Sequence, residues 1–404
     1  MSVRFRQNVI ILAMHDVIVV GAGPAGSYTA SRLAKLGYKV IVLEQKGEAG
    51  KNSCCTGIIS VECFNAFSLD ATIFRQASSA KFFAPSGEFI RVHRNDPQAY
   101  IIDRASLDKS LKQRAQDHGA DYLFSARVIA VTPELDCVSA VVNYQGKRRT
   151  FTAQVVILSC GFGSRFPEKL GLGEIAKSVF GAQAEVDVRD VDEVEIYFDQ
   201  DLFPGFFGWL VPTSGDRGLA GLLVPRASAS YLRNFLRYLQ AQGKIASAEA
   251  DMKLGIIPLG TLPQTYSARI IVVGDAAGQV KPATGGGIYY GLLCADIAVD
   301  CVHQAFLAND FSAAKLSLYD KRWRAKLGHE LQAGCRARWF YKKLSNRRID
   351  GIFHTMSSNG IPGFIAEWQD FSFDWHSTLI SKISKQLATE ASPQPIRTLL
   401  KHDD

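Results

Sequence analysis

A glycine-rich turn near the start of the chain constrains its fold more than any other feature. The apolar run His15–Val20 predicts a strand, and the sequence GAGPAG at 21–26 follows it directly, before a helical pattern over residues 27–36. A second apolar run, 39–43, ends in Glu44, eighteen positions beyond the last glycine. Glycines at this spacing between a strand and a helix, with an acid about twenty residues on, are typical of a dinucleotide-binding βαβ unit.

Each glycine of this turn has a distinct role in that interpretation. Gly21 permits the tight turn, Gly23 lets a pyrophosphate approach the backbone, and Gly26 allows the helix and the strand to pack closely. Glu44 is expected to accept hydrogen bonds from the adenosine ribose; a solvated strand end is the simpler account of a lone glutamate, but the spacing favours the ribose contact. The expected contacts in this unit are Gly21, Gly23, Pro24, Ala25, Gly26, Glu44 and Gln45.

A second glycine-rich segment, GDAAGQVKPATGGGIYYGLLC, occupies positions 274–294. It follows the β-branched run 269–273, so its first residues are expected at the carboxyl end of a buried strand, where ligands bind in open α/β sheets. Three successive glycines then precede a helix predicted over 288–306, and they leave backbone N–H groups bare at a helix N-terminus that favours negative charge. A turn kept only for tight packing is the alternative. The expected contacts are Gly274, Asp275, Pro282, Gly285, Gly286, Gly287 and Ile288.

These segments resemble FAD-dependent oxidoreductases of the p-hydroxybenzoate-hydroxylase type, and most closely the geranylgeranyl reductase family. The resemblance extends from about residue 14 to residue 301. Further matching motifs are KNSCCTGIIS at 51–60, YIIDRASL at 100–107, VVILSCGFGSR at 155–165 and DLFPGFFGWLVP at 201–212. The family implies FAD as cofactor, with Arg104 against the flavin and with contacts at Val128 and Gly161.

The same resemblance implies a reaction in which reduced flavin hydrogenates C=C bonds of a prenyl chain from its N5. It aligns Cys55 with the family's cysteine and makes it the expected proton donor, with Tyr289 and Tyr290 as weaker alternatives; a small buried residue is the plain account of a free cysteine. The expected substrate contacts are Phe206, Phe207, Trp209 and Tyr289, although a core stripe would need no ligand.

Two departures from the family pattern affect the site. Cys160 stands where many flavoproteins have aspartate, so a polar cofactor contact there has to come from the backbone. Cys54 and Cys55 are adjacent, which leaves open which sulfur faces the site.

Rival functions share these motifs. A flavin monooxygenase or halogenase has the same fold, but a halogenase is expected to show W-x-W-x-I-P where this chain has FGWLVP. A carotenoid-cyclase-like enzyme or an electron-transfer flavoprotein is the third alternative. No second nucleotide-binding fingerprint occurs, so the sequence leaves open whether the electron donor is NADPH or a ferredoxin-type protein.

The predicted fold class is α/β, α+β overall. It has a Rossmann-type FAD domain formed by 14–80, 100–180 and 266–310, an antiparallel-sheet substrate domain formed by 81–99 and 181–265, and a C-terminal helical region over 311–404. A chain of 404 residues is long for one core, which supports this division. No uninterrupted apolar run reaches eighteen residues, so no transmembrane helix is predicted. Residues 1–13 are read as a leader or an upstream start rather than a cleaved signal.

Composition is compatible with a cytoplasmic enzyme. Eight cysteines without regular spacing, and no CxxC motif, predict neither a disulfide scaffold nor a metal site. The net charge of +7 is concentrated among aromatic residues in the C-terminal third. No recognition motif accompanies this charge, so nucleic acid is not an expected partner. Peripheral contact with anionic lipid or an acidic electron donor fits the pattern, as does a solvated helical face.

Overall fold

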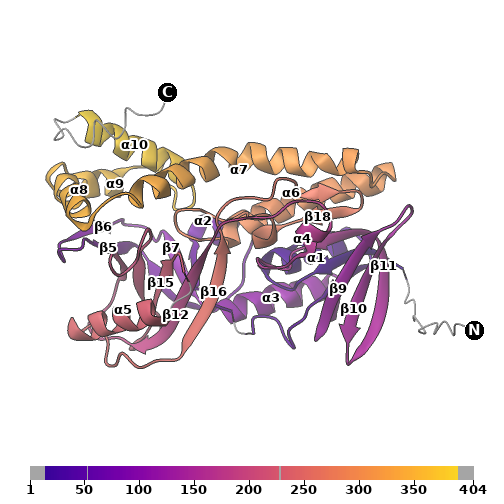
Figure 1. The fold of residues 1–404 in the computed structure, drawn as a ribbon, viewed down its shortest axis with the longest axis horizontal. Helices are drawn as coiled ribbons and strands as arrows, with labels where there is room; N and C mark the ends of the chain where they lie inside the picture. Colours follow the sequence, from indigo (N-terminus) through magenta and orange to yellow (C-terminus); the bar gives the residue numbers. More distant parts are fainter. Residues whose placement is uncertain (1–13, 52, 227–228, 390–404) are drawn as a thin grey trace, which may run out of the picture.

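Two large sheets lie side by side beneath one long helix, α7 (Ala313–Tyr341), which spans both of them (Figure 1). This computed structural model describes residues 14–51, 53–226 and 229–389. The order of its helices and strands confirms the predicted α/β class. The expectation for residues 1–13 lies outside the described residues.

The first sheet has a parallel core in the order β18-β11-β1-β2-β8, with β17 antiparallel at its edge. An antiparallel meander, β9-β10-β11, folds back over one face. The strands are β1 (His15–Val20), β2 (Val40–Leu43), β8 (Asp121–Leu123), β9 (Ala126–Pro133), β10 (Val138–Tyr144), β11 (Lys147–Leu158), β17 (Tyr266–Ser267) and β18 (Ile270–Val272).

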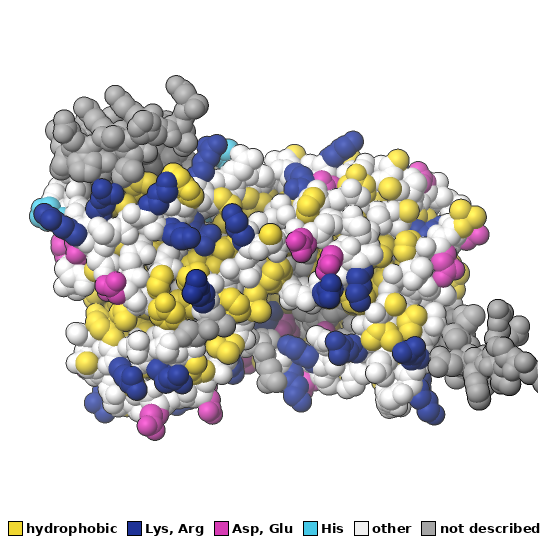
Figure 2. Space-filling model, viewed as in Figure 1, with side chains coloured by type: hydrophobic (Ala, Val, Ile, Leu, Met, Phe, Trp, Pro, Cys, Tyr) yellow, Lys and Arg dark blue, Asp and Glu magenta, His cyan; other side chains and the backbone are white. Residues whose placement is uncertain are grey.

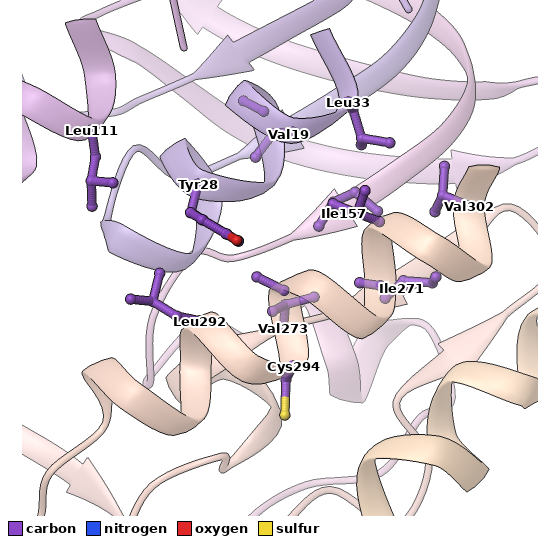
Figure 3. Close-up of a cluster of buried hydrophobic side chains, with 14 of the residues drawn as sticks. Val19, Tyr28, Leu33, Leu111, Ile157, Ile271, Val273, Leu292, Cys294 and Val302 are labelled. Atoms are coloured by element: carbon purple, nitrogen blue, oxygen red, sulfur yellow. The ribbon is translucent and has the colours of Figure 1, made fainter. Parts of the chain in front are cut away.

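Both faces of this sheet are buried, which explains why its strands are continuously apolar. Val17 and Val19 face a helical layer, whereas Ile18 and Val20 face the meander. The helical layer contains α1 (Pro24–Lys35), α3 (Arg104–Asp117) and α6 (Ile288–Ala308), and Figure 3 shows its core, including Val19, Tyr28, Leu33, Leu292 and Val302. Helices α1 and α6 confirm the two predicted helices, within a few residues at each end.

The second sheet has seven strands in the order β16-β12-β15-β14-β13-β5-β6, paired antiparallel except between β13 and β5. Helix α5 (Ala229–Ala241) covers one face, against which Ala182, Ala184 and Val186 pack. Val179 and Gln183 alternate with them and face the other way. The strands are β5 (Ser79–Phe83), β6 (Phe89–His93), β12 (Ser178–Asp187), β13 (Val194–Tyr197), β14 (Gly208–Pro212), β15 (Arg217–Val224) and β16 (Met252–Pro258).

A small antiparallel sheet, β3-β7-β4, is formed by β3 (Ile58–Ser60), β4 (Ile73–Ala77) and β7 (Ala99–Ile102). The C-terminal region is helical, as predicted, over its described residues, with α8 (Asn346–Ser358), α9 (Ile361–Glu367) and α10 (His376–Thr389) after α7. The remaining short helices are α2 (Val61–Ala66), α4 (Phe166–Lys169) and the 3₁₀ turn η1 (Gly274–Ala277).

Among the described helices, α6 alone is long and apolar enough to cross a membrane by length and composition. Half of its most apolar window is buried inside the protein. Its side chains pack into the core of the first sheet against α1 and α7, which accounts for its apolar composition.

Candidate functional site

The turn after β1 has two glycines that packing requires and one that opens onto empty space. Gly21 has φ +107°, and a Cβ there would lie 2.5 Å from the Ser159 carbonyl oxygen. A Cβ on Gly26 would lie 2.0 Å from the Gly21 carbonyl oxygen. A Cβ on Gly23 would meet no atom of the described residues within 4 Å. The backbone at Gly23 is therefore free to be approached by a ligand.

Helix α1 begins at this opening with an uncapped N-terminus. Its N-cap, Gly23, provides no side-chain hydrogen bond, Pro24 occupies the first turn, and that turn contains no acidic residue. The first N–H groups of a helix have no acceptors within the helix, so this end is suited to an anion. Glu44 lies beside it, buried, with its carboxylate oxygens accepting the N–H groups of Ala22 and Lys46 at 2.7 and 2.8 Å.

The second glycine-rich segment reaches the same edge of the sheet. Gly274, with φ +74°, packs against α1, since a Cβ there would lie 3.2 Å from Cβ of Ala25. This contact brings Asp275 to the mouth of the turn. A Cβ on Gly287, the N-cap of α6, would lie 2.6 Å from Oδ1 of Asp275, so only glycine leaves room for that carboxylate.

Arg104, at the start of α3, lies close enough to influence Asp275. Burial raises the pKa of the Asp275 carboxyl, and the positive charge of Arg104 opposes that rise. Nη1 of Arg104 donates to Oδ2 of Asp108 at 2.6 Å. Nε of Arg104 is nevertheless buried without a hydrogen-bond partner among the described residues. A buried polar atom is normally paired, so a ligand, an ion or a water molecule is expected at this position. Together with the open backbone at Gly23, Arg104 and Asp275 form a cradle that fits a dinucleotide.

The other predicted cofactor residues lie in several different places. Gly161, with φ +71° and open space around it, follows β11. Gln45 is exposed beyond Glu44, and Val128 is buried in the core between the sheet and the meander. Cys160 precedes Gly161 in the chain, and burial raises the pKa of its thiol. The loop before α6 contains Pro282, Gly285 and Gly286, and Ile288 is the first residue of that helix.

The two adjacent cysteines point in different directions. Cys54 lies against β16, where its Sγ is 3.6 Å from the Lys253 carbonyl oxygen, and burial raises the pKa of its thiol to about 11. Sγ of Cys55 instead accepts the N–H of Gly57 at 3.4 Å. Gly57 is packed against Ile102, so the cysteine loop lies on the approach to α3 and Arg104.

A buried glutamine ties the cysteine loop to the second sheet. Nε2 of Gln183 donates to the Cys55 carbonyl at 3.2 Å, while its Oε1 accepts the Thr56 hydroxyl at 3.1 Å and the Trp209 indole N–H at 3.4 Å. The indole lies over Gly221, where a Cβ would be 2.4 Å from the ring. The sequence contains no signal for this long-range contact.

Phe206, Phe207 and Trp209 are brought together, as a wall on the sheet face opposite α5. The same cluster includes Leu223 and Ile257, and it reaches the α6 loop, because a Cβ on Gly285 would lie 2.9 Å from Ile257. We call this cluster the aromatic wall; its members are Val179, Phe206, Phe207, Trp209, Leu223, Ile257 and Leu259.

Tyr289, the fourth predicted substrate contact, is not part of that wall. It is buried in the core of the first sheet, and its hydroxyl donates to Glu62 at 2.5 Å. Glu62 also accepts hydrogen bonds from Trp375 and Ser372, which belong to the segment before α10. The hydroxyl of Tyr290 donates to the Asp374 carbonyl at 3.2 Å.

The segment before α10 contributes a buried ion pair that no sequence motif indicates. Asp374 bonds Lys281, in the loop before α6, and the hydroxyl of Ser60. Both members of the ion pair are less than a tenth exposed. The C-terminal region therefore fixes one end of the loop that approaches the cradle.

Relatives of this chain are found among prenyl-lipid reductases. A digeranylgeranylglycerophospholipid reductase from Methanocaldococcus jannaschii is 30% identical over 358 residues, which cover 86% of this chain and 91% of that protein. A digeranylgeranylglycerophospholipid reductase 2 from Methanopyrus kandleri is 32% identical over 366 residues, with 86% and 91% covered. This chain belongs to the geranylgeranyl reductase family. It is an oxidoreductase, and the family's cofactor is a flavin.

A family model described as Lycopene cyclase protein matches residues 16–367, so the chain belongs to that sequence family as well. Solved structures agree with the fold of the reductase family. A geranylgeranyl bacteriochlorophyll reductase-like protein from Thermoplasma acidophilum superposes with a TM-score of 0.82 at 22% identity, covering 96% of this chain and 99% of that one. The flavin-dependent brominase Bmp2 superposes with a TM-score of 0.66 at 15% identity, covering 93% and 99%.

Proposed function

We propose that this reductase binds FAD and hydrogenates C=C bonds in a prenyl chain carried by a lipid, a diphosphate or a chlorophyll-type ester. One observation carries the proposal: the loop with Cys55 is held between the dinucleotide cradle and the aromatic wall, through Gly57 on one side and Gln183 on the other. The names of the relatives support the substrate class.

The chemistry of the cradle residues fits the successive parts of FAD. The open backbone at Gly23 and the N-terminus of α1 would hold the pyrophosphate, and Glu44 the adenosine ribose. Asp275 and Arg104 would hold polar atoms of the ribityl chain and flavin side, satisfying the Arg104 Nε that now lacks a partner.

When bound, reduced flavin would supply a hydride to one alkene carbon. The other carbon needs a proton, which we assign to the Cys55 thiol. Hydride and proton together add two protons and two electrons to the substrate; solvent would return a proton to the Cys55 thiolate, and NADPH or a ferredoxin-type donor would return the two electrons to the flavin. Trp209 and its neighbours in the aromatic wall would orient the apolar chain and exclude water from it.

Oxygenation, halogenation and cyclisation are the rival reactions. The halogenase neighbours are 15–18% identical, a level at which they show the fold alone. The cyclase family model covers most of the chain and keeps flavin-dependent cyclisation as the second candidate. Relatives at 30–32% identity that are named as reductases favour reduction.

The decisive experiment is anaerobic. The purified flavoprotein is reduced, mixed with a prenyl substrate such as geranylgeranyl diphosphate, and followed by flavin absorbance and product mass. Reduction predicts flavin reoxidation and a product heavier by about two mass units per turnover. A rearranged product of unchanged mass would identify a cyclase. Oxygen incorporation, in a parallel aerobic run, would identify a monooxygenase.

We also propose a cytoplasmic location with peripheral contact to a membrane. Trp339 on α7 is 57% exposed, and the Lys343 ammonium lies 3.1 Å from the centre of its ring. An aromatic side chain beside cations suits an anionic lipid surface. Co-sedimentation with vesicles containing anionic lipid, compared with neutral vesicles, tests this contact.

A further inference from the structure

Arg338, near the end of α7, is a partly buried cation that makes no ion pair with any described residue. Its guanidinium carbon lies 4.3 Å from the ring centre of Phe206, which is only 2% exposed. Its Nε is buried and has no hydrogen-bond partner among the described residues. A guanidinium in this setting gains some energy from the ring face, but its Nε donor stays unpaired.

The charge of Arg338 is not compensated by nearby carboxylates. Burial lowers its pKa, and among the described residues only the Cys335 side chain opposes that decrease electrostatically. Between Glu330 and Asp350 the sequence contains six arginines and lysines and no acidic residue. Arg338 is only partly withdrawn from water, so an anionic group from outside the chain that reaches it can provide the counter-charge that the described residues lack.

A second unpaired donor lies on the same face of α7, three residues further on. The hydroxyl of Tyr341 is buried and has no hydrogen-bond partner among the described residues. The centre of its ring lies 5.7 Å from the ring centre of Phe198, which in turn lies 6.2 Å from the ring centre of Phe207. Burial, and then the negative charge of Asp199, raise the pKa of this hydroxyl. Oδ1 of Asp199 already accepts two backbone N–H groups, at 2.7 and 3.0 Å.

Arg338 lies at the end of the aromatic wall that starts at the cradle. One turn earlier on α7, a Cβ on Gly334 would lie 3.1 Å from Pro282, in the loop before α6. Arg338 is four residues on, about 6 Å along the helix axis. From Gly285 the wall continues through Ile257 to Phe206. Figure 2 shows Lys and Arg side chains among hydrophobic ones over the half of the molecule where α7 passes above the second sheet.

We propose that Arg338 and Tyr341 bind the phosphate end of the substrate while its prenyl chain lies along the aromatic wall. This inference rests on the proposed function and narrows it to phosphorylated prenyl compounds. A guanidinium offers paired N–H donors that match two phosphate oxygens, and the Tyr341 hydroxyl adds a third donor. A free prenyl diphosphate and a prenyl phospholipid share this chemistry.

The first test uses the wild-type oxidised holoenzyme and measures binding by calorimetry. Geranylgeranyl diphosphate and digeranylgeranylglyceryl phosphate, in the same detergent, represent the two sources of phosphate; geranylgeraniol lacks the charge. At least one phosphorylated compound should bind about 10- to 100-fold more tightly than geranylgeraniol, in line with one charge-assisted interaction, and the tighter one identifies the source. Equal affinity for the alcohol and for both phosphates would overturn the inference, whether or not any variant folds.

The second test compares Arg338→Met with Arg336→Met, which removes an equal charge from an exposed position on the same helix. Arg338→Met should lose the preference for phosphate and leave the affinity for geranylgeraniol unchanged. Arg336→Met should bind as the wild type does, and Tyr341→Phe should weaken only the phosphorylated compounds. If Arg338→Met keeps the wild-type preference, the assignment is wrong. Failure to reduce any of these compounds would instead count against the proposed function.

Discussion

At the scale of single residues, the three glycines of the first turn are under different constraints. Gly23 has φ −73° and ψ −179°, a conformation that any residue adopts, and a Cβ there meets no protein atom. Gly21 and Gly26 are confined by the backbone of the same turn and by Ser159. Of the three, only Gly23 has no packing reason among the described residues to lack a side chain.

Gly23→Val should therefore abolish FAD binding while the apoprotein keeps its folded structure, because the valine occupies only the ligand's space. Gly26→Ala is the matched comparison. It should lower the free energy of unfolding by about 1–3 kcal/mol, since its Cβ would collide with the Gly21 carbonyl. Flavin content by absorbance and apoprotein melting by circular dichroism measure the two effects. Full FAD occupancy in Gly23→Val would show that the cradle is misassigned.

The adjacent cysteines allow a similar comparison. Cys55→Ser should retain FAD but slow the oxidation of reduced flavin by substrate about 10²–10⁴-fold, the usual contribution of a general acid. Cys54→Ser should have little effect, because the Cys54 sulfur lies against β16 at the Lys253 carbonyl. Stopped-flow absorbance under anaerobic conditions gives both rates. Equal, small losses would reduce Cys55 to a packing residue, and a large loss at Cys54 alone would move the proton donor by one position.

At the scale of elements, the segment before α10 stabilises the loop before α6. Asp374→Asn would leave the buried Lys281 ammonium without a counter-charge, so we expect a loss of about 3–5 kcal/mol in the free energy of unfolding. Asp370→Asn, at an exposed position of the same segment, should change it by less than about 0.5 kcal/mol. Urea denaturation measures both. Similar values for the two variants would mean that the ion pair contributes no net stability.

The same segment should respond to acid through His376. Burial and the neighbouring Lys281 charge lower the pKa of His376, whose Nε2 lies 3.0 Å from the Phe373 carbonyl oxygen. The folded protein therefore binds fewer protons than the unfolded chain near pH 6. This stabilising contribution is complete above the unfolded pKa of about 6.5 and is lost as pH falls towards the folded pKa. Denaturation at pH 7.5 and 5.5 should show a larger acid loss in the wild type than in His376→Gln; equal losses would assign the effect elsewhere.

At the scale of the whole molecule, the sequence predicts what depends on local pattern. The βαβ unit and helix α6 follow from glycine spacing and apolar periodicity, and the structure has them within a few residues. Contacts between distant segments leave no such pattern: Lys281 and Asp374 are 93 residues apart, and Gln183 and Cys55 are 128 apart. The sequence predicts Tyr289 as a substrate contact, but in the structure its hydroxyl donates a hydrogen bond to Glu62. No sequence motif marks the segment before α10 that also binds Glu62. Such contacts arise only when the elements pack together.

The cradle is assembled from residues around positions 23, 44, 104 and 275, so the cofactor should stabilise the whole molecule and not one segment. A ligand that binds only the folded state adds about 2.7 kcal/mol at a free concentration one hundred times its Kd. Removing FAD should thus lower the melting temperature, and adding it back should restore the original value. Differential scanning calorimetry of the apoprotein, the holoenzyme and the reconstituted holoenzyme measures this, with Gly23→Val as the control that FAD leaves unchanged. If apoprotein and holoenzyme melt at one temperature, FAD does not bridge the separated segments that the structure brings together.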